Sequence, residues 1–167
     1  MTVAFHATIM SASAERLFRE YEDPQNITVV TGIPVQVLAA ERPVRAGSLQ
    51  RFAIGPRWLH LQWEAMIEQY TPPHLLVDVQ KRGPFHRFRH AHYVVPIGAA
   101  RSAVVDIIEY EWRPGRLGRF VERVLLQAII TLLLRDRHRR LTALLRQSAP
   151  ARADSSAVCY VPEEVAP

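Results

Sequence analysis

Cysteine and lysine are almost absent from this chain: Cys159 is the only cysteine among 167 residues, and Lys81 is the only lysine. A single cysteine cannot form an intrachain disulfide, which excludes a disulfide-stapled secreted scaffold and favours a reducing compartment. The apolar segment of a signal peptide is also missing, because His6 and Glu15 fall where it would lie. We therefore expect a cytoplasmic protein.

Long hydrophobic runs are missing as well. The most apolar stretch, Val124 to Leu134, is interrupted by Gln127 and Thr131. It is shorter than the ~20 residues that span a bilayer. A buried helix is the first interpretation of this stretch, and a helix on a membrane surface is the second.

The charge of the chain has no single-sign block that would indicate a nucleic-acid-binding face. The net charge is +5, and the 21 basic residues are interleaved with 16 acidic ones. This spread argues against specific nucleic-acid binding. A pI near 10.0 still permits weak contact with an anionic membrane or an acidic protein.

The dominant positive feature is a long amphipathic segment, Leu117 to Arg146, without Pro or Gly after Gly118. Its apolar residues recur every three or four positions, which is the helical period. At about 1.5 Å per residue the helix would be roughly 45 Å long. A helix of this length needs a surface to pack on, and a strongly curved sheet would provide one.

Nearly everything before that segment reads as β-strand. Val3 to Met10 is the first strand, and two short helices follow, one capped by Ser13 and one from Pro24 to about Thr31. Six further strands are expected at Val35 to Glu41, Leu49 to Ile54, Trp58 to Tyr70, Leu75 to Arg82, Phe85 to Val95 and Ala103 to Trp112. The predicted fold is α+β, an antiparallel sheet in the order β-α-α-β6-α wrapped around the C-terminal helix.

The chain divides into one domain, residues 1–147, and a C-terminal tail, residues 148–167. The tail is rich in Ser, Ala, Pro, Asp and Glu and has no periodic apolar pattern. We expect it to be flexible, with Val158 to Val161 as a possible docking strand.

The last two predicted strands each have one charged face. Arg87 and Arg89 share a face in one strand, and Glu109 and Glu111 share a face in the next. Because charges favour water, both faces should point outward, with Arg89 opposite Glu109 and Arg87 opposite Glu111.

A tight hairpin at Gly83-Pro84 would extend this outward ladder to the preceding strand. It would set Asp78 beside Arg89 and Gln80 beside Arg87. Such solvated pairs contribute little energy but help to fix the register.

The opposite face of these strands would then point at the long helix. It carries His90, His92, Asp106 and Tyr110 among Trp63, Leu75, Val77, Val79, Phe88 and Val94. Buried polar groups must find partners or line a solvated cavity. A large curved sheet over one helix often cannot fill its interior, so we infer a mostly apolar cavity with a polar cluster.

The segment Gly83 to His92, GPFHRFRHAH, resembles the START-like SRPBCC ligand-binding and polyketide-cyclase-related proteins. Asp106 and Tyr110, four residues apart, match the D-x-x-x-Y pattern of that subgroup, and Phe88 stands where Trp is common. The resemblance runs from about Phe5 to Arg146 and also includes Pro114 to Gly118 and Arg137 to Arg140. It implies a helix-grip fold, like that of the birch pollen allergen, with a deep hydrophobic cavity. Relatives bind lipids, sterols, polyketides or quinone-like molecules, and some catalyse cyclisation or dehydration.

The candidate ligand-binding residues follow from the inferred cavity. They are Trp63, Val77, Val79, Phe88, His90, His92, Ile108 and Tyr110 from the sheet, and Phe120, Val124 and Ala128 from the helix. The aromatic members could stack on a flat ligand, or they could be ordinary core.

His90, His92 and Asp106 admit three interpretations. They could bind a metal, but no third strong ligand has an obvious place, so we expect neither metal nor cofactor. They could act as general acid and base in an aldol cyclisation or dehydration. The simplest interpretation is a hydrogen-bonded network that shapes the cavity.

The predicted function is binding or carriage of an apolar small molecule, such as a lipid, a polyketide or a quinone-like compound. A polyketide cyclase or dehydratase using His90, His92 and Asp106 is the alternative, and an interaction module with a fully packed interior is a further one.

The basic cluster Arg135, Arg137, Arg139 and Arg140 is most simply the solvated end of the helix. It could also contact an anionic membrane or an acidic protein.

Overall fold

The computed structural model describes residues 1–56, 58, 60–113 and 115–147, and of Leu117 only the backbone. The predicted tail, with its docking strand at Val158 to Val161, lies outside the described residues.

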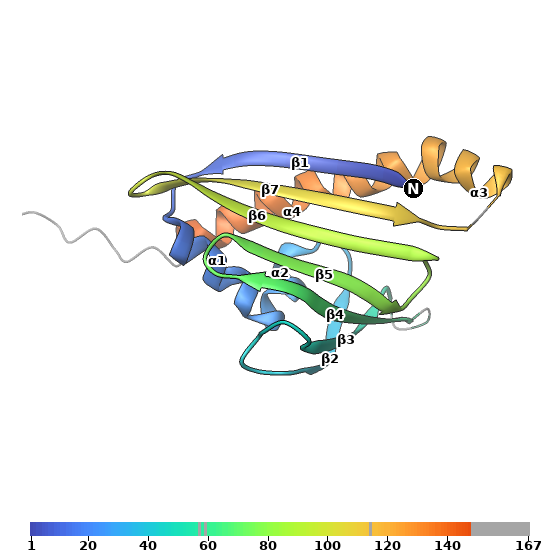
Figure 1. Ribbon diagram of the computed structural model, residues 1–167, viewed down its shortest axis with the longest axis horizontal. Coiled ribbons are helices and arrows are strands. Elements are labelled where there is room, and N and C mark those ends of the chain that lie inside the picture. The colour runs from blue at the N-terminus through green and yellow to red at the C-terminus, as the bar shows by residue number, and fades with distance from the viewer. Residues whose placement is uncertain (57, 59, 114, 148–167) are drawn as a thin grey trace, which may run out of the picture.

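Seven antiparallel strands form one curved sheet in the order β1-β7-β6-β5-β4-β3-β2 (Figure 1). The strands are β1 (Thr2–Met10), β2 (Val35–Ala40), β3 (Leu49–Ile54), β4 (Leu61–Thr71), β5 (Leu75–Arg82), β6 (Arg87–Gly98) and β7 (Arg101–Glu111). The element order confirms the predicted α+β fold. Two strands start later than expected, β4 at Leu61 rather than Trp58 and β6 at Arg87 rather than Phe85.

Two short helical elements connect β1 to β2. Helix α1 (Ala14–Glu22) begins at the predicted cap, where the Ser13 hydroxyl accepts a hydrogen bond from the Arg16 amide. The predicted second helix is a 3-10 turn, η1 (Pro24–Asn26), followed by a single α-turn, α2 (Ile27–Val30). These elements pack near α4, and they close one side of the sheet interior.

The long C-terminal helix contains an interruption that the sequence did not predict. Helix α3 (Arg116–Val121) passes into a five-residue π-helical segment, η2 (Glu122–Leu126), and then into α4 (Gln127–Gln147). Glu122 is buried there, and its carboxylate accepts hydrogen bonds from the Trp112 amide at 2.6 Å and the Thr2 hydroxyl at 2.9 Å. These bonds tie the start of the helix to the end of β7 and the start of β1.

The apolar core has two parts, both between α4 and the sheet. One joins α1 and the end of α4 to the sheet, and it includes Leu17, Phe18, Val104, Leu141 and Leu145. The other surrounds Tyr110, Ile130 and Leu134, with Phe85 and Phe88 packed against it. The space between α2, α4 and strands β3 to β5 is not filled by either part.

The register of β6 on β7 confirms the outward charge ladder. Arg89 lies opposite Glu109, and Arg87 lies opposite Glu111. Arg89 also bonds to Glu68 of β4, with Nε 2.7 Å from Oε2.

The predicted register of β5 on β6 is wrong by one residue. Val79, not Asp78, lies opposite Arg89, and Asp78 lies opposite His90. The loop between β5 and β6 is longer than a tight Gly83-Pro84 hairpin. The Gln80 side-chain amide spans it, donating to the Phe85 backbone oxygen and accepting from the Phe85 backbone N–H. Because side chains alternate between faces, a slip of one residue moves Asp78 from the outer face to the inner one.

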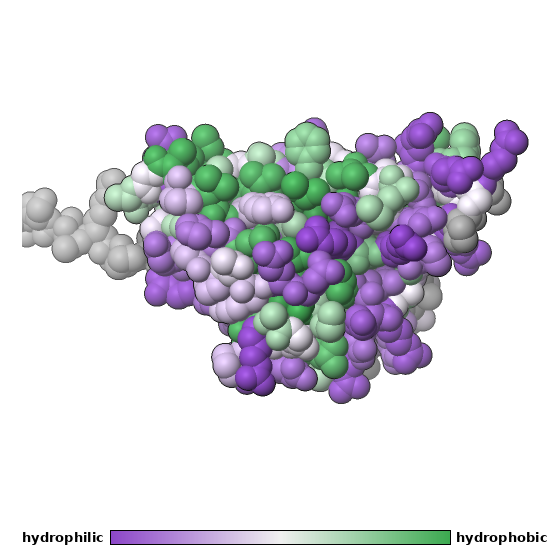
Figure 2. All heavy atoms as spheres, in the orientation of Figure 1, coloured by the Kyte–Doolittle hydropathy of each residue, from purple (hydrophilic) through white to green (hydrophobic). Residues whose placement is uncertain are grey.

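Two surfaces expose large apolar side chains. Figure 2 shows one over the β1 and β7 part of the outer sheet face, where Val3, Phe5 and Ile9 are exposed. The other lies on the helix, where Phe120 and Val124 are 64% and 61% exposed. No helix among the described residues is long and apolar enough to cross a membrane.

Candidate functional site

A cavity of about 420 Å³ lies between the inner face of the sheet, α2 and α4. Most of its wall is apolar and comes from Phe52, Trp63, Ala65, Ile67, Leu76, Phe85, Phe88, Ile108, Ile130 and Leu134. Four polar residues, Asp78, His90, His92 and Arg137, gather along one part of the wall. The interior is therefore not fully packed, which counts against an interaction module without a ligand.

Five of the predicted ligand-binding residues line this cavity: Trp63, Phe88, His90, His92 and Ile108. The Trp63 and Phe88 rings meet edge to face, with centroids 4.8 Å apart. A binding role for these five residues stays a prediction.

Six of the predicted ligand-binding residues do not line the cavity. Val77 and Val79 lie on the outer face, because the β5 register differs from the predicted one by one residue. Tyr110 is fully buried and packs against Phe85. Phe120, Val124 and Ala128 are exposed on the helix.

The helix contributes different residues to the wall than the sequence indicated. The sheet-facing side chains are Glu122, Ile130, Leu134 and His138, at intervals of four or eight positions. Ile130, Leu133, Leu134 and Arg137 reach the cavity. The π-helical turn adds a residue to the helical repeat, which changes the face that an uninterrupted helix would present.

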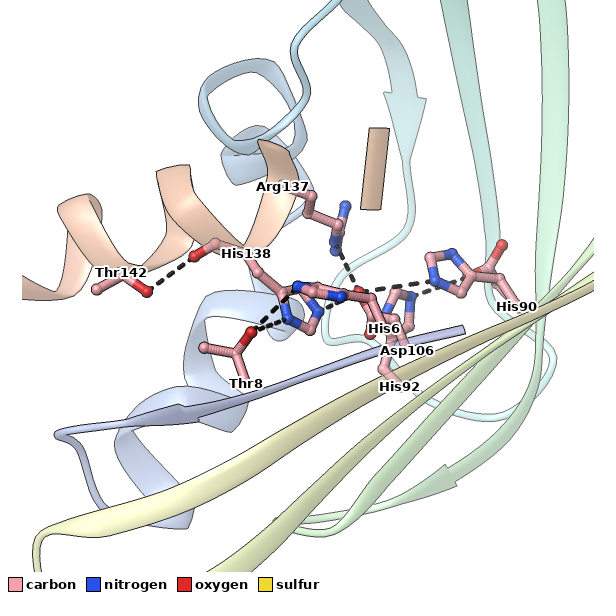
Figure 3. Close-up of polar contacts among 9 residues, drawn as sticks. His6, Thr8, His90, His92, Asp106, Arg137, His138 and Thr142 are labelled. Atoms are coloured by element: carbon pink, nitrogen blue, oxygen red, sulfur yellow. Dashed lines mark hydrogen bonds and ion pairs between the residues drawn. The ribbon is translucent and has the colours of Figure 1, made fainter. Parts of the chain in front are cut away.

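Asp106 is the centre of the polar cluster (Figure 3). Its carboxylate is fully buried; Oδ1 lies 2.7 Å from His92 Nδ1, and Oδ2 lies 3.1 Å from His138 Nε2 and 3.4 Å from Arg137 Nε. An ionised carboxylate only accepts hydrogen bonds, so both histidine nitrogens donate to it. Burial opposes this charge, but the charge of His92 and the hydrogen bonds from His138 and His92 outweigh it and hold the pKa of Asp106 well below its usual range.

His92 lies between two carboxylates. Its Nε2 is 3.3 Å from Asp78 Oδ2, while its Nδ1 faces Asp106. Burial alone would lower the pKa of His92, but the charge of Asp106 and the hydrogen bonds to both carboxylates raise it above its ordinary value. The pKa of Asp78 is lowered, because the His92 hydrogen bond and the neighbouring positive charges outweigh its burial. Each ring nitrogen of His92 thus faces one carboxylate.

His90 is the least satisfied polar residue of the cluster. It is 9% exposed, and its Nε2 has no hydrogen-bond partner among the described residues. The nearest carboxylate oxygens are 4.0 Å away on Asp78 and 3.8 Å away on Asp106. Burial, reinforced by the charge of His92, lowers the pKa of His90 to about 3, so its imidazole is neutral at physiological pH.

Sequence reasoning placed Arg137 wrongly and passed over His138. The sequence groups Arg137 with a solvated basic cluster, yet its side chain is 17% exposed, pairs with Asp106 and lies over the Tyr21 ring. His138 Nδ1 accepts from the Thr8 hydroxyl at 3.0 Å. His138 follows Leu134 by four residues and Arg137 follows Leu133 by four, and this helical periodicity was the signal that could have placed them inside.

The remaining members of that basic cluster do lie at the surface. Arg139 and Arg140 both bond to Asp136 on the same helix, and Arg135 is exposed. Their charge is thus partly neutralised within the helix.

Comparison with known proteins is informative at the level of the fold. The chain matches no protein-family model, and no curated protein matches it at a significant level. Many solved structures do match it.

Three of these solved structures cover nearly the whole chain. A START superfamily protein from Mycobacterium smegmatis is 14% identical with a TM-score of 0.65, covering 87% of this chain and 97% of its own. Norcoclaurine synthase from Thalictrum flavum, in complex with dopamine and hydroxybenzaldehyde, is 15% identical with a TM-score of 0.65, covering 90% and 89%. A protein from Thermus thermophilus is 19% identical with a TM-score of 0.65, covering 86% and 99%. The chain has the START-like, helix-grip fold.

Proposed function

We propose that this protein binds a largely apolar small molecule in the cavity between the sheet and α4, with the polar end of the ligand at the Asp78, His90, His92 and Arg137 wall. The observation that carries the proposal is the cavity itself. Its volume of about 420 Å³ falls within the ~300–1,000 Å³ of small-molecule sites.

The chemistry of the wall supports a ligand with two ends. The Trp63, Phe85 and Phe88 rings form an apolar end suited to an aliphatic chain or a flat ring system. At the other end, His90 Nε2 is buried without a hydrogen-bond partner among the described residues, and Arg137 Nε is buried with the 3.4 Å ion pair to Asp106 but no hydrogen bond to a described residue. Buried polar atoms of this kind cost free energy unless a partner reaches them, and a ligand carbonyl or hydroxyl would be such a partner.

The test is displacement of a fluorescent apolar probe, anilinonaphthalene sulfonate, by a panel of fatty acids, quinones and aromatic polyketide-like compounds. Ala65→Phe should fill the cavity, because Ala65 is buried on its wall. Ala7→Phe makes the same change on an exposed position of the outer face and serves as the control. We expect Ala65→Phe to weaken binding at least about tenfold, near 1.4 kcal/mol, and Ala7→Phe to leave it unchanged. Equal binding by both variants, with circular dichroism showing both folded, would sink the proposal.

Acid–base catalysis is a second candidate, and the position of His90 is the observation that favours it: its imidazole lines the cavity, and its Nε2 has no hydrogen-bond partner among the described residues. A neutral imidazole beside a held carboxylate can take or give a proton in a cyclisation or dehydration. The two candidates differ for His90→Gln. A binder keeps ligand affinity within about tenfold, whereas an enzyme loses turnover by a factor of about a hundred or more while it still binds.

A cytoplasmic location is part of the proposal. It rests on the single cysteine, which can form no intrachain disulfide.

A further inference from the structure

The cavity wall carries three side chains whose ligand atoms face one another: Asp78, His90 and His92. One oxygen of Asp78 and one nitrogen from each histidine lie within 4.8 Å of one another. Asp78 and His90 are cross-strand partners on β5 and β6, and His92 follows two residues later on the same face. We propose that these three residues bind one divalent transition-metal ion. The site shares the polar wall of the cavity with the proposed ligand, but it does not depend on a ligand being there.

The separations require little movement for an ion to bind. Ligand atoms about 2.1 Å from one metal ion are at most about 4.2 Å apart. The two contacts to Asp78 Oδ2, 3.3 Å from His92 and 4.0 Å from His90, already satisfy this limit. Only the widest separation must close, by about half an ångström, and rotation of the His90 ring can do that because its Nε2 bonds to no described residue.

The groups behind the three ligands have the arrangement expected around a metal. His92 donates its Nδ1–H to Asp106 at 2.7 Å, which fixes the tautomer and leaves Nε2 pointing at Asp78. A carboxylate that orients a histidine in this way is typical of metal-binding histidines. Asp106 is in turn held by His138 and Arg137.

The charge and the donor types indicate the class of ion. When the imidazoles are neutral, the carboxylates of Asp78 and Asp106 and the guanidinium of Arg137 give the cluster a net charge of −1. A divalent cation would offset this charge. Two imidazoles and one carboxylate suit ions such as Fe²⁺, Co²⁺ and Zn²⁺ rather than Mg²⁺ or Ca²⁺. The three ligands lie on one side of the site, so the remaining coordination positions face the cavity.

The test is a titration of the metal-free full-length chain with Co²⁺, followed by its visible absorption and by competition with Zn²⁺. We expect one ion per chain and a visible band that reports nitrogen and oxygen ligands. Asp78→Asn and His92→Gln should each weaken binding by about a hundredfold, and Asp106→Asn by about tenfold to a hundredfold. His6→Gln is the matched control, because His6 lies beside His138 but outside the three ligands.

Absence of a stoichiometric Co²⁺ complex in the wild-type protein would overturn the proposal without the use of any variant. So would undiminished binding by folded Asp78→Asn, or an equal loss in His6→Gln. None of these outcomes affects the probe-displacement test of the apolar cavity when that test is run on metal-free protein.

A separate surface carries a second inference. From Arg116 to Leu132 the helix exposes Phe120, Val124, Leu125, Ile129 and Leu132 by 41–64%, and no described residue covers this face. Exposed apolar residues in such a row mark an interaction surface. Beside them Arg116, Arg119 and Arg123 are exposed, and the only acidic residue of the segment, Glu122, is buried.

We infer that this helix face docks on an anionic lipid surface. An apolar stripe flanked by arginines matches the interfacial helices that insert between acyl chains while their cations meet anionic headgroups. Charge complementarity decides the occupant, because three arginines that pair with no described carboxylate favour a negatively charged surface over a second copy of this basic chain. The position differs from the Arg135 to Arg140 cluster that the sequence indicated.

Co-sedimentation with vesicles tests this surface. The wild-type chain should bind vesicles that are half phosphatidylglycerol and not vesicles of phosphatidylcholine alone. Arg119→Gln with Arg123→Gln should weaken binding about thirtyfold. Phe120→Ser with Val124→Ser should abolish it, whereas Phe5→Ser with Ile9→Ser, equally exposed on the outer sheet face, should not. The inference would be overturned if the wild type failed to bind the anionic vesicles, or if both serine pairs lost binding equally. It would also be overturned if the wild type were a dimer that Phe120→Ser with Val124→Ser dissociates.

Discussion

Asp106→Asn is the perturbation that most directly probes how the polar cluster is held. The substitution keeps the size and shape of the side chain and removes its charge. Asp106 is fully buried, and four groups surround it: His92, His138, Arg137 and His90, at 2.7, 3.1, 3.4 and 3.8 Å. The amide removes the buried negative charge that Arg137 and the His92 ring face.

The expected cost is about 4 kcal/mol in the free energy of unfolding. Hydrogen bonds to a buried charge contribute about 1.5–3 kcal/mol each, and Asp106 accepts two. Breaking a buried ion pair from one side costs about 3–5 kcal/mol, which agrees. For a chain of this size the melting temperature should fall by about 10 °C.

Urea unfolding followed by tryptophan fluorescence measures this cost, with Glu109→Gln as the matched control. Glu109 is on the same strand but faces outward, 3.9 Å from Arg89, and its side chain is 32% exposed. Its loss should cost less than about 1 kcal/mol. A histidine titration by NMR should also show the pKa of His92 falling in Asp106→Asn. If Asp106→Asn unfolds within about 1 kcal/mol of the wild type, the carboxylate does not hold the cluster and the reasoning fails.

Three further predictions concern single positions. Because the pKa of His90 is lowered to about 3, its contribution to the free energy of unfolding is present above pH 6.5 and declines as the pH falls. Between pH 7 and 5 the wild type should lose about 2 kcal/mol more than His90→Gln in urea unfolding. Parallel pH curves for the two proteins would contradict this. Gly118→Ala should lower the melting temperature markedly, since the added Cβ would lie 1.9 Å from the Arg113 backbone oxygen. Gly98→Ala should not lower it, because no atom lies within 4 Å of the added Cβ there. Equal melting temperatures for the two variants would count against the packing described. Glu122→Ala should cost about 2–4 kcal/mol, because two partly buried donors lose their buried acceptor. Hydrogen exchange should speed up in α3 and at the end of β7, and unchanged exchange there would be the contrary result.

The fold could be predicted because its signals are periodic and local. Alternation in β4 put Leu61, Trp63, Ala65 and Ile67 on one face, and all four line the cavity. The three-and-four spacing after Gly118 predicted the long helix. Opposite charges set β6 against β7 in the correct register.

The site could be predicted only in part, because its assembly depends on loop length and helix rotation. A longer connection than a tight hairpin shifted the β5 register by one residue, which turned Asp78 inward and supplied the third ligand atom whose absence had argued against a metal. A π-helical turn changed which helix residues face the sheet. Arg137 and His138 sit in a run of arginines that reads as a solvated helix end, and in the structure both contact Asp106.

The measurement that tests the central claim most directly is native mass spectrometry of the chain purified from its own host, beside Ala65→Phe. We predict a bound small molecule at near-stoichiometric amount in the wild type, absent from Ala65→Phe, and apolar over most of its structure with one polar end. A clean unliganded mass for both proteins, together with no binding from the lipid, quinone and polyketide-like panel, would contradict the account of the cavity as a ligand site.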